Sequence, residues 1–123
     1  SAAVGQSILM SAYADAFRPF GTTVAQVLLT RQDFLRQTAF RNAHLTLEEL
    51  IAQKVLPIIN ENDTVATQEL RFGDNDILSA LVAGMIQAQF LVIVTDVDGL
   101  YTADPRHHPD AHRIAEVTEL SPE

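Results

Sequence analysis

Two short polar clusters in the middle of the chain carry the residue types best suited to holding a polar ligand. Residues 60–63 read Asn-Glu-Asn-Asp, and residues 73–76 read Gly-Asp-Asn-Asp. Carboxylates and carboxamides are unfavourable beside buried apolar elements unless they bind something. The ordinary alternative is that these side chains form turns and helix caps. A third polar pair, Thr95 and Asp96, follows another apolar run, and the three together favour a binding site.

The elements next to these clusters predict how the clusters are positioned. The continuous apolar run at residues 55–59 predicts a strand buried on both faces, which ends at the first cluster. A helix is predicted over residues 76–88, with Asp74 or Asn75 as its N-cap. A third strand, over residues 90–95, ends at Thr95. Ligands bind beyond the carboxyl ends of parallel strands and at helix N-termini, so one polar ligand could span these positions.

The rest of the chain continues the alternation of helices and strands. Residues 2–17 predict a helix, residues 22–29 a strand, and the second half of residues 30–54 another helix. A hairpin is expected near residues 65–72 and a short strand at residues 114–117. The apolar stripe of the first helix is Ile8, Leu9, Ala12, Tyr13, Ala16 and Phe17, and that of the second is Phe40, Ala43, Leu47, Leu50 and Ile51.

This order of elements predicts an α/β fold, a three-layer αβα sandwich around a mainly parallel sheet. With 123 residues and no internal linker, the chain is expected to be one domain or part of one. The net charge of -8 argues against nucleic acid or an anionic membrane surface as the partner. The lack of cysteine and of a signal-peptide pattern at the start fits a cytoplasmic protein.

Longer motifs resemble a known family. Residues 60–65 (Asn-Glu-Asn-Asp-Thr-Val) together with residues 73–76 closely resemble the glutamate kinases, a branch of the amino acid kinase family. Residues 95–106, read TDVDGLYTADPR, resemble the nucleotide-binding loop of the wider family. Residues 2–6 and 28–31 are similar to the same kinases. The resemblance implies phosphorylation of the side-chain carboxylate of L-glutamate by ATP with Mg²⁺, at the start of proline synthesis. It also implies a homo-oligomer inhibited by proline.

The resemblance assigns roles to the two central clusters. Asn60, Asp63 and Asn75 would bind glutamate, with Asp63 and Asp74 facing its α-ammonium. Asp76 would be the catalytic residue, an acidic organiser that positions cationic groups around the transferring phosphoryl. A glutamate carboxylate, with a pKa of about 4.3, is already ionised at neutral pH, so no general base is needed.

The resemblance also places the nucleotide. Thr95 and Asp96 would contact ATP, and the loop through Tyr101 and Asp104 would close around it. Catalysis would then consist of positioning and of neutralising the phosphate charge. The histidines at 107, 108 and 112 are not expected to hold a metal, because Pro109 prevents the helix that would bring a four-residue pair together.

Cationic residues for that task are scarce in this chain. It has one lysine, Lys54, and five glycines too widely spaced to form a phosphate-binding loop. The family pattern has a Lys-Gly loop on its first strand and a later Gly-rich segment with a second lysine, and neither is present. We therefore expect residues 1–123 to be the central portion of one kinase domain, inactive alone. The alternatives are a kinase of the same fold for acetylglutamate, aspartate or a nucleotide, and a non-catalytic amino-acid-binding module.

Overall fold

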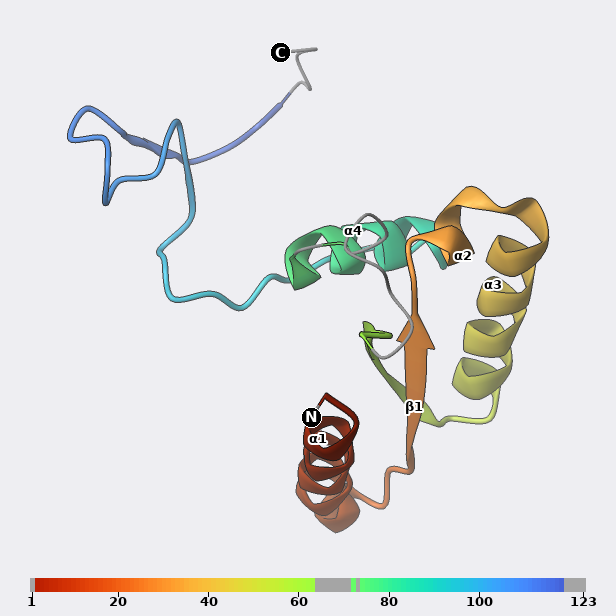
Figure 1. Ribbon diagram of the computed structural model, residues 1–123. Helices are drawn as coiled ribbons and strands as arrows, with labels where there is room; N and C mark the ends of the chain where they lie inside the picture. The colour runs from red at the N-terminus through yellow and green to blue at the C-terminus, as the bar shows by residue number, and fades with distance from the viewer. Residues whose placement is uncertain (1, 64–71, 73, 119–123) are drawn as a thin grey trace. The chain divides into compact units, whose positions relative to one another are not determined.

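Two parallel strands, β1 (Val24–Leu29) and β2 (Leu56–Glu61), form the centre of the larger part of the protein (Figure 1). The computed structural model describes residues 2–63, 72 and 74–118. The chain divides into two compact units, Ser1–Leu91 and Val92–Glu123. The predicted hairpin near residues 65–72 lies outside the described residues except for Phe72, which is not in a strand.

The strands pair in register from Val24 with Leu56 to Leu29 with Glu61. The connection between them contains α2 (Gln32–Leu35) and α3 (Gln37–Ala52), as a parallel pair requires. Both predicted strands and their parallel pairing are confirmed. The prediction that the second strand is fully buried is wrong, because each of its residues is half-buried. Within the described residues β1 is its only neighbour in the sheet, so one edge of β2 stays uncovered.

The core lies between the sheet and the helices α3 and α4 (Asn75–Met85). Leu47 is its most deeply buried member, at 1% exposure, and Ala43 lies one turn before it. These two confirm the centre of the predicted stripe on α3, whereas Phe40 and Ile51 at its ends are exposed. The cluster of buried apolar side chains consists of Leu29, Ala43, Leu47, Phe72, Leu78, Val82 and Met85.

Helix α1 (Ala2–Phe17) contacts β1 and has the predicted bounds. Its predicted apolar stripe is wrong, because Ile8, Leu9 and Tyr13 are exposed. The half-buried positions are instead Gln6, Met10, Ala14 and Phe17. These residues share one helix face. On this face Gln6 donates a hydrogen bond to Gln26 of β1 and accepts one from Asn60 of β2. A short 3-10 turn, η1 (Arg18–Phe20), follows α1.

Helix α4 begins at the second polar cluster. Asp74 is the N-cap, and its side chain accepts a hydrogen bond from the backbone N–H of Asp76. The predicted cap is therefore confirmed, and the helix ends at Met85, three residues earlier than predicted. No helix in the described part of the chain is long and apolar enough to cross a membrane.

The second unit contains a small antiparallel pair, β3 (Leu100–Tyr101) and β4 (Arg113–Ile114). The predicted strand at residues 114–117 is thus shorter and starts one residue earlier. The predicted strand at residues 90–95 is wrong, because these residues have irregular backbone and Phe90, Val92 and Val94 are 85%, 81% and 94% exposed. A strand needs a hydrogen-bonded neighbour, and the described residues give this segment none.

Candidate functional site

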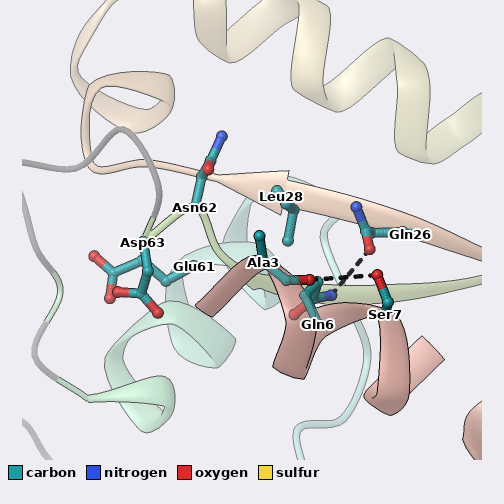
Figure 2. A pocket seen from close by; sticks show the side chains of 8 residues that line it. All are labelled: Ala3, Gln6, Ser7, Gln26, Leu28, Glu61, Asn62 and Asp63. Atoms are coloured by element: carbon teal, nitrogen blue, oxygen red, sulfur yellow. Dashed lines mark hydrogen bonds between the residues drawn. The ribbon is translucent and has the colours of Figure 1, made fainter. Parts of the chain in front are cut away.

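The carboxyl ends of β1 and β2 lie together, because Leu29 pairs with Glu61 and the carbonyl of Leu29 accepts a hydrogen bond from the N–H of Asn62 at 2.9 Å. A cavity of about 180 Å³ opens there, between α1 and the strand ends (Figure 2). Its lining residues are Ala3, Gln6, Ser7, Gln26, Leu28, Glu61, Asn62 and Asp63. The first polar cluster therefore borders a cavity at the sheet edge where a ligand is expected.

Asn60 lies inside β2 and not after it, so the prediction that the whole cluster follows the strand is wrong. Its side-chain amide donates a hydrogen bond to Gln6 Oε1 at 3.0 Å. Its Oδ1 accepts one from the N–H of Glu61 at 2.9 Å. Asn60 is half-buried and bonded to Gln6, a lining residue, so it belongs to the wall behind the cavity.

Asp63 is exposed and lines the cavity together with Glu61. In Figure 2 these two carboxylates lie to the left of the Gln6 and Gln26 carboxamides. Among the described residues that line the cavity there are two carboxylates and no lysine or arginine. A site with this charge favours a cationic group such as an ammonium.

The two aspartates of the second cluster differ: Asp74 has a structural role, whereas the side chain of Asp76 is exposed in the first turn of α4. Asp74 caps α4 through the N–H of Asp76 at 2.7 Å, which is the ordinary alternative for such a residue. The backbone carbonyl of Asp76 accepts a hydrogen bond from the Ser79 hydroxyl at 2.7 Å, and the residue is exposed in the first turn of α4. A carboxylate there is stabilised by the positive end of the helix dipole.

Asn75 lines a different cavity, of about 380 Å³, beside the uncovered edge of β2. Most of the side chains around it are apolar, among them Pro57, Ile59 and Leu78. The structure thus brings Asn60 and Asp63 to one cavity and places Asn75 at another. Glu61, which lines the first cavity, is connected to the chain just before α4, because its Oε1 accepts a hydrogen bond from the N–H of Phe72.

The second unit holds the residues predicted to bind the nucleotide. Thr95 and Asp96 are exposed, and Tyr101 is half-buried in β3. The Tyr101 hydroxyl donates a hydrogen bond to Asp98 Oδ1 at 2.8 Å. This bond to a carboxylate raises the pKa of Tyr101 above its ordinary value.

In the loop of residues 95–106, Asp104 is hydrogen-bonded to Arg106. Its Oδ1 accepts hydrogen bonds from the backbone N–H of Arg106 at 2.9 Å and from Arg106 Nε at 3.2 Å. The backbone bond first, and the guanidinium second, lower the pKa of Asp104 and stabilise its charged form. The same carboxylate raises the pKa of Arg106. Arg106 is thereby paired within the loop.

A magnesium ion is the metal that a phosphoryl-transfer site would use, and it takes oxygen ligands. In residues 2–63, 72 and 74–118 no three His, Cys, Asp or Glu side chains gather to hold a metal ion. The carboxylates of the described part therefore do not form a magnesium site by themselves.

Gln6, Gln26 and Glu61 are polar residues that line the cavity but were not predicted as site residues. Glu61 lies within the first cluster, so its position in sequence was a usable signal. Gln6 lies in the motif of residues 2–6, and only the resemblance pointed to it. Gln26 gives no local signal, because a single polar residue in a strand is ordinary.

Comparison with known proteins assigns the family. The model of the amino acid kinase family matches residues 1–122. The chain belongs to the amino acid kinase family. The glutamate 5-kinase of Gloeobacter violaceus is 59% identical over 123 residues, which are all of this amino acid kinase chain and 33% of the relative. That of Geobacter sulfurreducens is 54% identical, again over the whole chain and 33% of the relative.

A less similar relative is glutamate 5-kinase 1 of Bacillus subtilis, 50% identical over 123 residues, the whole chain and 34% of the relative. The chain thus spans about a third of the length of these curated relatives. The parallel sheet with helices on both faces agrees with the α/β class predicted for the family.

Proposed function

We propose that the complete protein is a glutamate 5-kinase, which transfers the γ-phosphoryl group of ATP to the side-chain carboxylate of L-glutamate. The supporting observation is the acidic cavity at the carboxyl end of β2, bordered by Asp63 and backed by Asn60. It occurs in a chain that is 50–59% identical, over its whole length, to the proteins named glutamate 5-kinase above. The product, glutamyl 5-phosphate, begins proline synthesis.

The cavity would hold the amino-acid end of glutamate. The Asp63 carboxylate attracts the α-ammonium, and Glu61 adds negative charge on the same side. The Asn60 carboxamide can donate to a carboxylate oxygen of the substrate with its second N–H. Asn75 lies at the neighbouring cavity, and its contact with glutamate is a prediction from the resemblance.

The transfer itself needs no proton movement. An oxygen of the ionised side-chain carboxylate attacks the γ-phosphorus, the bond from phosphorus to the β–γ bridging oxygen breaks, and ADP leaves with the electron pair. Mg²⁺, bound with ATP, would neutralise phosphate charge. Asp76 at the start of α4 would organise the cationic groups, and Thr95, Asp96 and Tyr101 would contact the nucleotide. Inhibition by proline and assembly into oligomers stay predictions from the resemblance.

A coupled assay for ADP release on the complete protein tests this function. L-Glutamate should support turnover, while N-acetylglutamate, aspartate and uridylate should support little. N-Acetylglutamate lacks a free ammonium, the side chain of aspartate is shorter, and uridylate lacks the amino-acid group. Preferential turnover of one of those three would make the protein a kinase for another substrate. Glutamate binding in calorimetry with no ADP release would make it a non-catalytic binding module.

A further inference from the structure

Three carboxamides from three different elements form a chain of hydrogen bonds behind the cavity. Gln6 Nε2 of α1 donates to Gln26 Oε1 of β1 at 3.2 Å. Gln6 Oε1 accepts from Asn60 Nδ2 of β2 at 3.0 Å. Figure 2 shows Gln6 and Gln26 facing each other beside the cavity, with the hydrogen bond between them drawn. Gln6, which lies on α1 and lines the cavity, therefore bridges β1 and β2.

The chain of bonds fixes which way the Asn60 amide points. A carboxamide has a donor end and an acceptor end of nearly the same shape, so only its partners select between the two orientations. Gln6 Oε1 requires the NH₂ end, because an oxygen cannot donate. The N–H of Glu61 requires the oxygen end, at 2.9 Å. Both ends of Asn60 are thereby set before a ligand arrives.

Asn60 keeps capacity for a ligand in this orientation. The amide has two N–H groups, and the bond to Gln6 uses one of them. If Gln6 were replaced by an apolar residue of similar length, the NH₂ end would lose its partner, and the amide would be held only at its oxygen end by the N–H of Glu61. A ligand would then bind an amide that must first be ordered, which weakens binding.

A role in packing alone does not explain Gln6. The face of α1 turned toward the sheet already includes Met10, Ala14 and Phe17, all half-buried. An apolar residue at position 6 would extend this face and bury more apolar surface. A carboxamide at this position instead satisfies two other carboxamides, one on each strand.

We propose that Gln6 is a positioning residue for the substrate: it orients the Asn60 carboxamide so that its remaining N–H is presented to an oxygen of glutamate. This inference rests on the proposed function. It concerns glutamate and not the nucleotide, because Gln6 and Gln26 line the same cavity as Asp63.

The test compares Gln6→Met with Ser11→Ala in the complete protein. Met is close to Gln in length but neither donates nor accepts strongly, so the KM for glutamate should rise about five- to tenfold, the effect of one hydrogen bond. The KM for ATP and the melting temperature should change little. Ser11 is exposed on the same helix, is not among the described residues that line the cavity, and donates a hydrogen bond from its hydroxyl to the carbonyl of Ser7 within α1, so Ser11→Ala should leave both KM values unchanged.

A double-mutant cycle separates positioning from direct contact. If Gln6 acts through Asn60, Gln6→Met should have no further effect on the KM for glutamate in an Asn60→Ala background. An equal effect in both backgrounds would overturn the inference, as would an unchanged KM in Gln6→Met alone. Gln6→Glu, which keeps an acceptor for Asn60 Nδ2, should recover part of the affinity. A wild-type protein that does not turn over glutamate would overturn the proposed function itself, and this result is distinct from the others.

Discussion

The carboxylate of Glu61, the last residue of β2, accepts a hydrogen bond from the backbone N–H of Phe72 at 2.9 Å. Phe72 is buried and packs edge-to-face on Phe34, with ring centroids 5.5 Å apart. The bond therefore anchors residue 72, two positions before the Asp74 cap, to the end of the strand. It connects the first polar cluster to the residue that directly precedes the second.

Replacing Glu61 should show this link in stability. Glu61→Leu leaves the N–H of Phe72 without its partner and should lower the free energy of unfolding of the complete protein by about 1–3 kcal/mol. Glu61→Gln keeps an oxygen that can accept the bond and should lose less than half of that. Chemical denaturation measures both. Equal losses in the two variants would show that the charge of Glu61 matters and the bond to Phe72 does not.

Asp63 should act on glutamate and not on ATP. In Asp63→Asn the carboxylate proposed to face the α-ammonium is replaced by a neutral group of the same size, so the KM for glutamate should rise by about tenfold or more. The KM for ATP should change by less than about twofold, because the nucleotide is assigned to residues 95–101. Steady-state kinetics with each substrate varied in turn measure this. Equal increases in both KM values would remove Asp63 from the substrate site.

Replacing Asp74 should lower the stability of the protein, whereas replacing Asp76 should lower its kcat. Asp74→Ala removes the cap of α4 and should cost about 1 kcal/mol of stability. Asp76→Asn keeps the backbone N–H that the cap uses, so its stability should change little while kcat falls by about 100-fold or more. Thermal unfolding and turnover are measured on the same preparations. An Asp76→Asn protein with normal kcat would contradict the catalytic role.

The Tyr101 hydroxyl should titrate differently when Asp98 is changed. In Asp98→Asn the acceptor loses its charge, so the pKa of Tyr101 should fall toward its ordinary value of 10.0. The bond favours the protonated hydroxyl, so its contribution to stability is complete below the unfolded value and is lost as the pH rises through the raised folded value. Titration of ring-labelled tyrosine by NMR measures the shift. An unchanged pKa would show that the bond to Asp98 does not form in solution.

The pKa of Asp104 is shifted in the opposite direction from that of Tyr101, so its effect on stability depends on pH in the opposite way. Its pKa is lowered, so its contribution to stability is complete above the unfolded value of 3.8 and is lost as the pH falls through the lower folded value. Arg106→Ala removes the guanidinium and keeps the backbone N–H, so the pKa should rise only part of the way to 3.8. Carboxyl-carbon NMR titration measures this. A full return to 3.8 would show that the guanidinium and not the backbone bond lowers the pKa.

Local patterns were sufficient where neighbours in sequence decide the structure. The bounds of α1, the cap at Asp74 and the buried pair Ala43 and Leu47 all follow from helical periodicity and capping chemistry. The position of Asp63 at a cavity follows from its place just after a parallel strand. These features depend on residues within a few positions of one another.

The features that the sequence did not predict depend on distant residues. The face that α1 turns to the sheet includes Gln6, whose partner Asn60 is 54 positions away, and the apolar stripe predicted the wrong face. The segment at residues 90–95 has the composition of a buried strand, but composition supplies no neighbour for its backbone. The separation of Asn75 from Asp63 has the same origin, because spacing along the chain does not say which cavity each lines.

The parallel pairing of β1 with β2 has a consequence for folding. Val24 meets Leu56 only after the whole connection through α2 and α3 has closed, and closing such a connection has an entropic cost before any pairing offsets it. Asn60 and Asp63 lie at the strand whose docking completes that closure. An amino acid held there would therefore bind the closed chain and not the open one, and should slow the opening of this crossover, which hydrogen exchange at the β1 amides would report.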